Sequence, residues 1–387
     1  MHFHCIAGSK IGVLPFHPAF PAVAICDPLM ALSFHLASGA FAPPTFAAVQ
    51  ITLLYDGSGR PWQQQALAQW CQSLPDGPAH WQWRIAGLPA AAELAMPQLV
   101  QLPRGWWARW RYQHRLQQQL LAQPPQVVLK MGQAPVPASW KGPVARLYHP
   151  DWCTCGTLRP TTGAVLAGYH WQWPATHASH GAIMGTAALP GTAQASWQQK
   201  EQTKQTYSDD SEYWLAIPGT APDDAVHLLK AFSQLKKRQQ TSMRLLVLFE
   251  ADAPAAWLQK LSSYKYRHDV QVHERAPLTL LQALLPAAYA LLLHPQAAHG
   301  WLMASAMTAG TPMAVPDTPT GTELLSGACY RLQQWAEEPL AAAMSLLYRD
   351  EHYRNTLIHT GSTLAAAMPL ARQQHALYQW LQQLTTS

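Results

Sequence analysis

Few residues of this sequence stand in a pattern that could carry chemistry. Cys153 and Cys155 form a C-x-C pair, but a zinc site needs a wider spacing and a second pair, and none follows. His177 and His180 are three residues apart, yet no carboxylate or cysteine lies close to them in the sequence. We therefore expect ordinary thiols and solvated histidines here, with no metal ion and no cofactor.

Glycine motifs that could hold a phosphate are equally sparse. Residues 56–59 (DGSG) follow a predicted strand but lack the third glycine of a dinucleotide-binding fingerprint, so they indicate a turn. The sequence holds no G-x-S-x-G nucleophile motif and no Walker loop. The sequence therefore lacks the common motifs of α/β-hydrolases and of P-loop nucleoside triphosphatases.

The elements that must position any site can be predicted from composition and periodicity. The chain of 387 residues is long enough for two domains, and its 49 % apolar and 12 % charged residues exclude a disordered or coiled-coil protein. No apolar run of about 18 residues predicts a membrane-spanning helix, and residues 1–30 lack a secretory pattern. Since the six cysteines are scattered, as in reduced proteins, we expect a cytoplasmic location.

Positive charge is concentrated in the first half, together with tryptophan. Residues 1–200 hold 12 Lys or Arg against 5 Asp or Glu (net +7), whereas residues 201–387 hold 14 against 16 (net −2). Residues 106–122 combine both features, which favours either a packed helix or a helix at a membrane surface. We expect the packed helix, with one set of side chains buried (Trp107, Trp110 and Leu120) and two exposed (Arg109 and Arg115). Nucleic acid is not an expected partner, because no recognised motif accompanies the charge.

Strand-like and helix-like segments alternate, which predicts an α/β protein with doubly wound parallel sheets. In the first half we predict strands at residues 49–55, 99–102 and 126–130 and helices at 61–73 and 106–122. Residues 167–198 lack periodicity, so we expect a loop there and a domain connection near 185–205. In the second half we predict one parallel sheet from residues 213–217, 244–249, 269–272, 288–293 and 313–315. Helices are predicted at 223–239, 254–264, 278–285, 301–308, 338–348, 351–368 and 372–384.

Several segments of the second half occur together in one known family. They are residues 212–232 (EYWLAIPGTAPDDAVHLLKAF), 264–270 (YKYRHDV), 287–292 (AAYALL) and 305–312 (SAMTAGTP). In this order and spacing they resemble the nucleotide-sugar-dependent glycosyltransferases of family 4 (group 1). The resemblance implies a GT-B fold of two domains. Residues 1–195 would form the acceptor-side domain and 196–387 the nucleotide-sugar domain, with 372–384 as a closing helix that packs back on the first.

The same resemblance assigns candidate site residues. His149 and Asp151 match the family's His-Asp pair, with Pro150 between them, and are our candidate catalytic residues. The candidate donor-binding positions are Gly219, Gly300, Ser305 and Glu323.

Two departures from the family pattern affect the donor. Asp223 and Asp224 stand where the family has a basic pair for the diphosphate, and their alternative role is to cap a helix. Ala297 and Ser305 stand where the family has two glutamates, a loss of about 1.5–3 kcal/mol for each charge-assisted hydrogen bond. The free N–H groups at the start of helix 301–308 would still offer weak anion binding.

Two functions remain open. By resemblance, the chain is a glycosyltransferase that transfers sugar from a nucleotide sugar, with retention, to a cell-surface glycan or lipid acceptor, at or near the inner membrane. The alternative is a catalytically inactive pseudo-glycosyltransferase that acts as a binding or scaffold partner.

Overall fold

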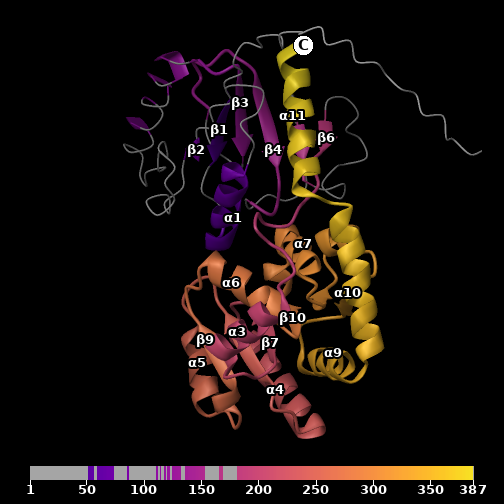
Figure 1. Ribbon diagram of the computed structural model, residues 1–387. Helices are drawn as coiled ribbons and strands as arrows, with labels where there is room; N and C mark the ends of the chain where they lie inside the picture. The colour runs from indigo at the N-terminus through magenta and orange to yellow at the C-terminus, as the bar shows by residue number, and fades with distance from the viewer. Residues whose placement is uncertain are drawn as a thin grey trace, which may run out of the picture. The chain divides into compact units, whose positions relative to one another are not determined.

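The computed structural model describes residues 51–55, 59–73, 85–86, parts of 110–122, 124–131, 136–152, 165–168 and 181–386. All of them belong to one compact unit, Phe46–Ser387. Its elements include two separate six-stranded sheets, each with parallel pairing between neighbours (Figure 1). The division of the chain at residue 195 stays a prediction.

The first sheet is built from short strands in the order β2-β1-β3-β4-β5-β6. Their bounds are β1 Ile51–Tyr55, β2 Ile85–Ala86, β3 Val127–Met131, β4 Val144–Tyr148, β5 Val165–Ala167 and β6 Gly181–Ile183. Helix α1, Pro61–Gln72, follows β1 and begins at a proline, which is tolerated in the first helical turn. The carboxyl ends of these parallel strands lie at one edge of the sheet, so the turn after β4 lies at that edge.

The second sheet has the order β12-β11-β10-β7-β8-β9, and it confirms the five predicted strands and their parallel pairing. Its strands are β7 Tyr213–Ile217, β8 Arg244–Leu248, β9 Val270–His273, β10 Ala290–Leu293, β11 Met313–Pro316 and β12 Tyr330–Leu332. β12 adds a sixth strand that we did not predict.

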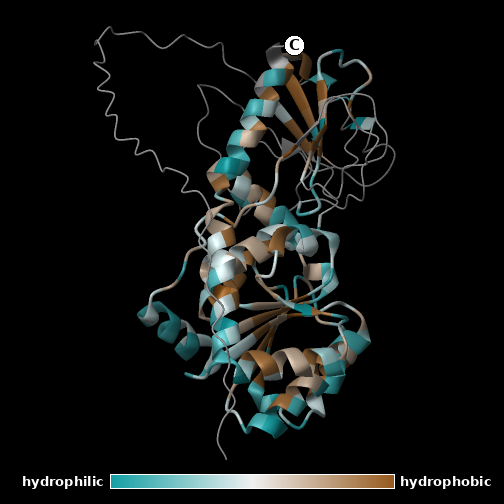
Figure 2. Ribbon diagram, turned by 90° about the vertical axis from the view of Figure 1, so that its right-hand side faces the viewer, coloured by the Kyte–Doolittle hydropathy of each residue, from teal (hydrophilic) through white to brown (hydrophobic). Residues whose placement is uncertain are grey.

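Helices cover both faces of this sheet, as the continuous apolar strands predicted. In β7, Leu215 faces one hydrophobic core and Trp214 faces the other, because successive side chains of a strand point to opposite faces. Figure 2 shows apolar strands inside and polar helix surfaces outside. The helices are α3 Trp197–Ser208, α4 Pro222–Gln239, α5 Ala255–Ser262, α6 Leu278–Leu284, α7 Gly300–Ala309, α8 Pro319–Leu325, α9 Glu337–Arg349, α10 Glu351–Ala366 and α11 Leu370–Thr386.

The last helix, α11, contacts the first sheet at β3 and β6. Its buried side chains Leu377, Trp380 and Leu381 join the core that also contains the β3 residues Val127 and Leu129. Helix formation here follows from its strongly amphipathic sequence.

Two predictions for the first half are wrong. Trp110 is 52 % exposed and stacks on the exposed His114, one helical turn further on, rather than lying in the core. Leu120 is buried, as predicted, whereas Trp107, Arg109 and Arg115 lie outside the described residues, as does the predicted strand at 99–102. The predicted loop at 167–198 contains β6 and the start of α3, which carry too few apolar residues for a periodic pattern.

Candidate functional site

Among the elements that follow the strands of the second sheet, the N-terminus of helix α7 is the one best arranged to bind an anion. β10 ends at Leu293, a short 3-10 turn follows, and His299 is the N-cap residue of α7. The first N–H groups of a helix have no partner within it and carry the positive end of the helix dipole. From the sequence we expect these N–H groups to be available for a weakly bound anion.

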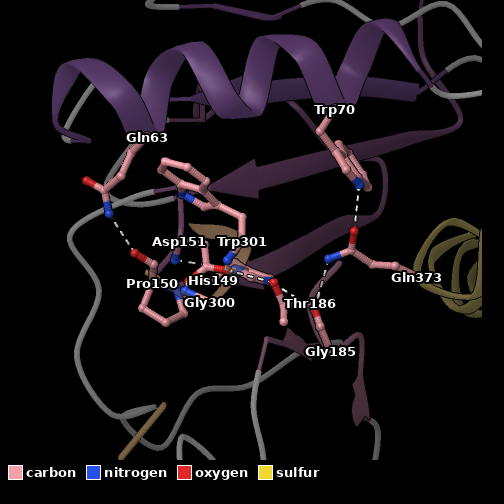
Figure 3. Close-up of polar contacts among 10 residues, drawn as sticks. All are labelled: Gln63, Trp70, His149, Pro150, Asp151, Gly185, Thr186, Gly300, Trp301 and Gln373. Atoms are coloured by element: carbon pink, nitrogen blue, oxygen red, sulfur yellow. Dashed lines mark hydrogen bonds and ion pairs between the residues drawn. The ribbon is translucent and has the colours of Figure 1, made fainter. Parts of the chain in front are cut away.

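They are instead bound by Asp151, which corrects that expectation. The Asp151 carboxylate accepts the Gly300 N–H at 2.7 Å through Oδ1 and the Trp301 N–H at 2.9 Å through Oδ2. The Thr186 hydroxyl donates to Oδ2 at 2.9 Å (Figure 3). Asp151 is buried, with 1 % of its surface exposed. The carboxylate therefore binds where a phosphate would bind at a helix N-terminus.

The turn after β4 positions Asp151. It closes through a hydrogen bond from the Trp152 N–H to the His149 carbonyl oxygen at 3.1 Å. Gln63 of α1 donates its side-chain amide to the Pro150 carbonyl oxygen at 2.6 Å. The Trp152 ring lies between His149, at a centroid distance of 4.2 Å, and Trp70, at 4.6 Å. This aromatic packing fixes the turn against α1.

His149 lies next to Asp151 but is itself fully buried. Its Nε2 lies 2.9 Å from the Gly185 carbonyl oxygen, which can only accept, so Nε2 carries the proton of the neutral ring. Burial lowers the pKa of His149, against the raising effects of Asp151 and of the Gly185 hydrogen bond. His149 is therefore a neutral ring whose Nδ1 faces Asp151, 3.9 Å from Oδ2.

A second group of polar side chains, Asp224 and His294, lies against Gly219. The Asp224 carboxylate accepts the Ala221 N–H at 3.0 Å, which confirms that this residue caps α4. His294 Nε2 lies 3.4 Å from Asp224 Oδ1. A Cβ at Gly219 would lie 2.2 Å from Asp224 Oδ2 and 2.5 Å from His294 Cε1, so this position needs a glycine. Asp223 is exposed in the first turn of the same helix.

A positive charge that we did not predict lies close to His294 and His299. Arg60, at the start of α1, donates to the Gln296 carbonyl oxygen at 3.1 Å. Burial lowers the pKa of His294, and the Arg60 charge adds to this lowering against the raising effect of Asp224. Burial and Arg60 likewise lower the pKa of His299 to about 4, against the raising effect of Asp151. Burial also raises the pKa of Glu250, which Arg60 opposes. In the sequence, Arg60 is preceded by the glycine-containing residues 56–59, which we interpreted as a turn without a binding role.

The remaining donor-binding candidates, Ser305 and Glu323, make no contact with Asp151 among the hydrogen bonds of the described residues. Ser305 is buried within α7, and its hydroxyl oxygen accepts the Leu189 N–H at 2.9 Å. Ala297, the position that the resemblance matches to a glutamate, is also buried. Glu323 is exposed in α8. The structure therefore brings together His149, Asp151 and Gly300 among the predicted site residues.

Two kinds of feature are absent from the residues that the structure describes: a cluster of metal ligands and a membrane-spanning helix. That part of the chain holds no group of three or more His, Cys, Asp or Glu side chains that could bind a metal ion. Within the same residues, no helix has the length and apolar character to cross a membrane.

Solved structures of other proteins share the arrangement of these two sheets. No protein-family model and no curated protein matches the sequence. A glycosyltransferase structure from Rickettsia africae matches with a TM-score of 0.66 at 10 % identity, over 88 % of this chain and 99 % of that chain. Anabaena HepE, in complex with UDP and glucose, matches with a TM-score of 0.63 at 10 % identity, over 86 % and 99 %.

A third structure carries a different activity on the same fold. The UDP-GlcNAc 2-epimerase of Neisseria meningitidis, bound to UDP-GlcNAc, matches with a TM-score of 0.59 at 11 % identity, over 87 % of this chain and 100 % of that chain. The likeness at these identities is one of fold. With its two parallel α/β sheets, the chain has the GT-B fold that the sequence predicted.

Proposed function

We propose that this protein binds a nucleotide diphosphate sugar and transfers the sugar, with retention, to a cell-surface glycan or a lipid-linked acceptor. One observation carries the proposal. His149 and Asp151 follow β4 of the first sheet, and the Asp151 carboxylate reaches the N–H groups at the start of α7 in the second. Two sheets thus contribute to one anion-binding position, as a reaction between a bound donor and a separately bound acceptor requires.

The donor phosphates would take the place of the Asp151 carboxylate at the start of α7. Transfer breaks the bond between the sugar's anomeric carbon and the phosphate oxygen, and it leaves negative charge on the diphosphate. The N–H groups of Gly300 and Trp301 and the nearby Arg60 would stabilise that charge. Gly219 allows the close approach of the chain to His294 and Asp224. Ser305 and Glu323 remain proposed donor contacts, and His149 and Asp151 remain the proposed catalytic pair.

A non-catalytic binding or scaffold protein is the second candidate. It is favoured by the residues that replace the family's charged groups: Ala297 and Ser305 are both buried, and Asp224 caps its own helix. Such a protein would keep the fold and the partner surfaces without turning over a donor.

Turnover of the donor separates the two candidates. We would incubate the protein with a panel of UDP-, GDP- and ADP-sugars and follow release of the nucleoside diphosphate, with water as the substitute acceptor. The enzyme predicts release that falls at least tenfold in Glu323→Ala. Glu338→Ala, an exposed glutamate of α9, is the matched control and should keep full activity. Failure of every donor to bind or turn over would support the scaffold protein.

We also propose a cytoplasmic location with peripheral contact to a membrane surface. The support is two exposed apolar side chains of one segment, Trp110 at 52 % and Leu121 at 64 %, together with the exposed Arg111. Flotation with anionic liposomes should recover the protein, and Trp110→Ser with Leu121→Ser should abolish recovery. Trp197→Ser, which removes a 77 % exposed tryptophan of α3, is the control that should still float. Equal flotation of both variants would contradict membrane contact through this helix.

A further inference from the structure

Asp151 reproduces the contacts of a bound anion at α7. Its two oxygens are shared between two backbone N–H groups of a ten-residue helix, at 2.7 and 2.9 Å, and the Thr186 hydroxyl supplies a third donor at 2.9 Å. A phosphate group offers the same kind of acceptor oxygens and the same sign of charge. A carboxylate and a phosphate cannot hold these donors at the same time.

A polar group beside the helix start lacks a partner. His299 is the N-cap residue of α7, and its Nε2 is buried without a hydrogen-bond partner among the residues the structure describes. A buried polar atom of this kind costs free energy unless a ligand or water satisfies it. It is a polar group at this helix start, separate from the backbone N–H groups, that a bound ligand could satisfy.

We propose that Asp151 is an internal competitor of the donor's diphosphate, so that a nucleoside diphosphate binds only when the Asp151 side chain leaves the start of α7. The inference rests on the proposed function, because it concerns regulation of that same site. The apparent dissociation constant then equals the intrinsic constant divided by the fraction of molecules in which Asp151 has left. A ligand or partner that draws the Asp151 side chain away from α7 would therefore raise donor affinity without touching the donor.

Thr186 sets how firmly the competitor is held. Its hydroxyl is a donor to Asp151 from outside α7, and it precedes Leu189, whose N–H is bound by Ser305. Removing the Thr186 hydroxyl leaves the carboxylate in place but weakens its hold. The structure therefore offers two variants of graded effect, Asp151→Asn and Thr186→Val.

Titration calorimetry with UDP tests the proposal on the full chain. We expect Asp151→Asn to bind UDP at least tenfold more tightly than the natural chain and Thr186→Val to bind it a few-fold more tightly. Asp350→Asn is the matched control, because Asp350 accepts the Tyr353 N–H at the start of α10 and so loses an equivalent cap elsewhere. It should leave UDP affinity unchanged. Circular dichroism of each variant establishes that it is folded.

The outcomes separate this proposal from the proposed function. Equal UDP affinity of the natural chain and Asp151→Asn overturns the competitor and leaves donor binding intact. Tighter UDP binding by Asp151→Asn, with no turnover of any nucleotide sugar by the natural chain or by Thr186→Val, supports the competitor and overturns the transferase. If neither protein binds UDP, GDP or ADP, both proposals are overturned, because Asp151 would then not be what keeps the anion out.

Discussion

At the scale of single residues, the site is defined by close packing around two side chains. Asp151 holds the start of α7, and His149 lies in a stack with Trp152. Gly168 allows this stack, because a Cβ at that position would lie 2.8 Å from His149 Cδ2. Neither partner of the stack is free to move at low cost, since both are buried.

Replacing Gly168 should therefore destabilise the protein. We expect Gly168→Ala to lower the free energy of unfolding by about 1–3 kcal/mol, the usual cost of overpacking a core. Urea unfolding followed by circular dichroism measures the change. Gly361→Ala is the control, because the nearest atom to its Cβ would be Cγ of the flexible Met307 side chain, at 3.2 Å, in a helix that favours alanine. A neutral Gly168→Ala would contradict the stack as described.

Buried histidines should make the protein sensitive to acid. The pKa of His299 is lowered to about 4, below its ordinary value of 6.5, because burial disfavours the charged ring. The unfolded chain then binds the extra proton, so stability is present above pH 6.5 and is lost as the pH falls toward 4. At about 1.4 kcal/mol per pKa unit, the difference between 6.5 and 4 makes His299 account for about 3.5 kcal/mol.

His299→Gln should flatten this acid loss, measured as the free energy of unfolding at pH 7, 6, 5 and 4. His359→Gln, at an exposed position of α10, is the matched control and should follow the natural chain. An unchanged slope in His299→Gln would show that His299 is not the titrating group. The lowered pKa values of His149 and His294 predict residual acid sensitivity of the same sign.

At the scale of elements, the apolar strands of the second sheet were predictable and the polar elements were not. Strands such as β8 (RLLVL) have continuous apolar runs that only a doubly covered sheet can bury. α3 (WQQKEQTKQTYS) is polar on all sides, and its one sequence signal was the capping box of Ser196 and Gln199. β5 and β6 have three residues each, too few to show a period.

Helix α11 depends on one polar side chain as well as on its apolar face. Gln373 accepts the Trp70 indole N–H at 2.8 Å and donates to the Gly185 carbonyl oxygen at 2.9 Å, so it links α11 to α1 and to the loop after β6. Gln373→Ala leaves these buried groups without that partner and should cost about 2–4 kcal/mol in unfolding free energy. Gln379→Ala, exposed on the same helix, should cost less than about 0.5 kcal/mol. Equal costs would mean that the link contributes nothing.

At the scale of the whole molecule, the site is assembled from residues far apart in the sequence. Asp151 and Gly300 are 149 positions apart, and no local pattern indicates that they meet. The resemblance named both residues, but as separate catalytic and donor-binding positions. Arg60, Thr186 and His299 escaped prediction because each acts only through a contact between distant elements.

This assembly also predicts weak binding of donors to the natural chain. Asp151 occupies the anion position, and the resemblance implies that Asp223 and Asp224 stand at the places of a basic pair. We expect UDP-sugars to bind with a dissociation constant near millimolar or weaker, about −4 kcal/mol. Calorimetric titration checks this value. Micromolar binding by the natural chain would contradict it and would indicate that the usual donor contacts persist in another form.

The hydrogen bonds from Gly300 and Trp301 to Asp151 are the central claim, and amide hydrogen exchange tests them most directly. These two N–H groups have no partner within α7, so their protection depends on the carboxylate. The account predicts slow exchange at both amides in the natural chain and at least tenfold faster exchange in Asp151→Asn, with the rest of α7 unchanged. Fast exchange in the natural chain, or equal exchange in both proteins, would contradict it.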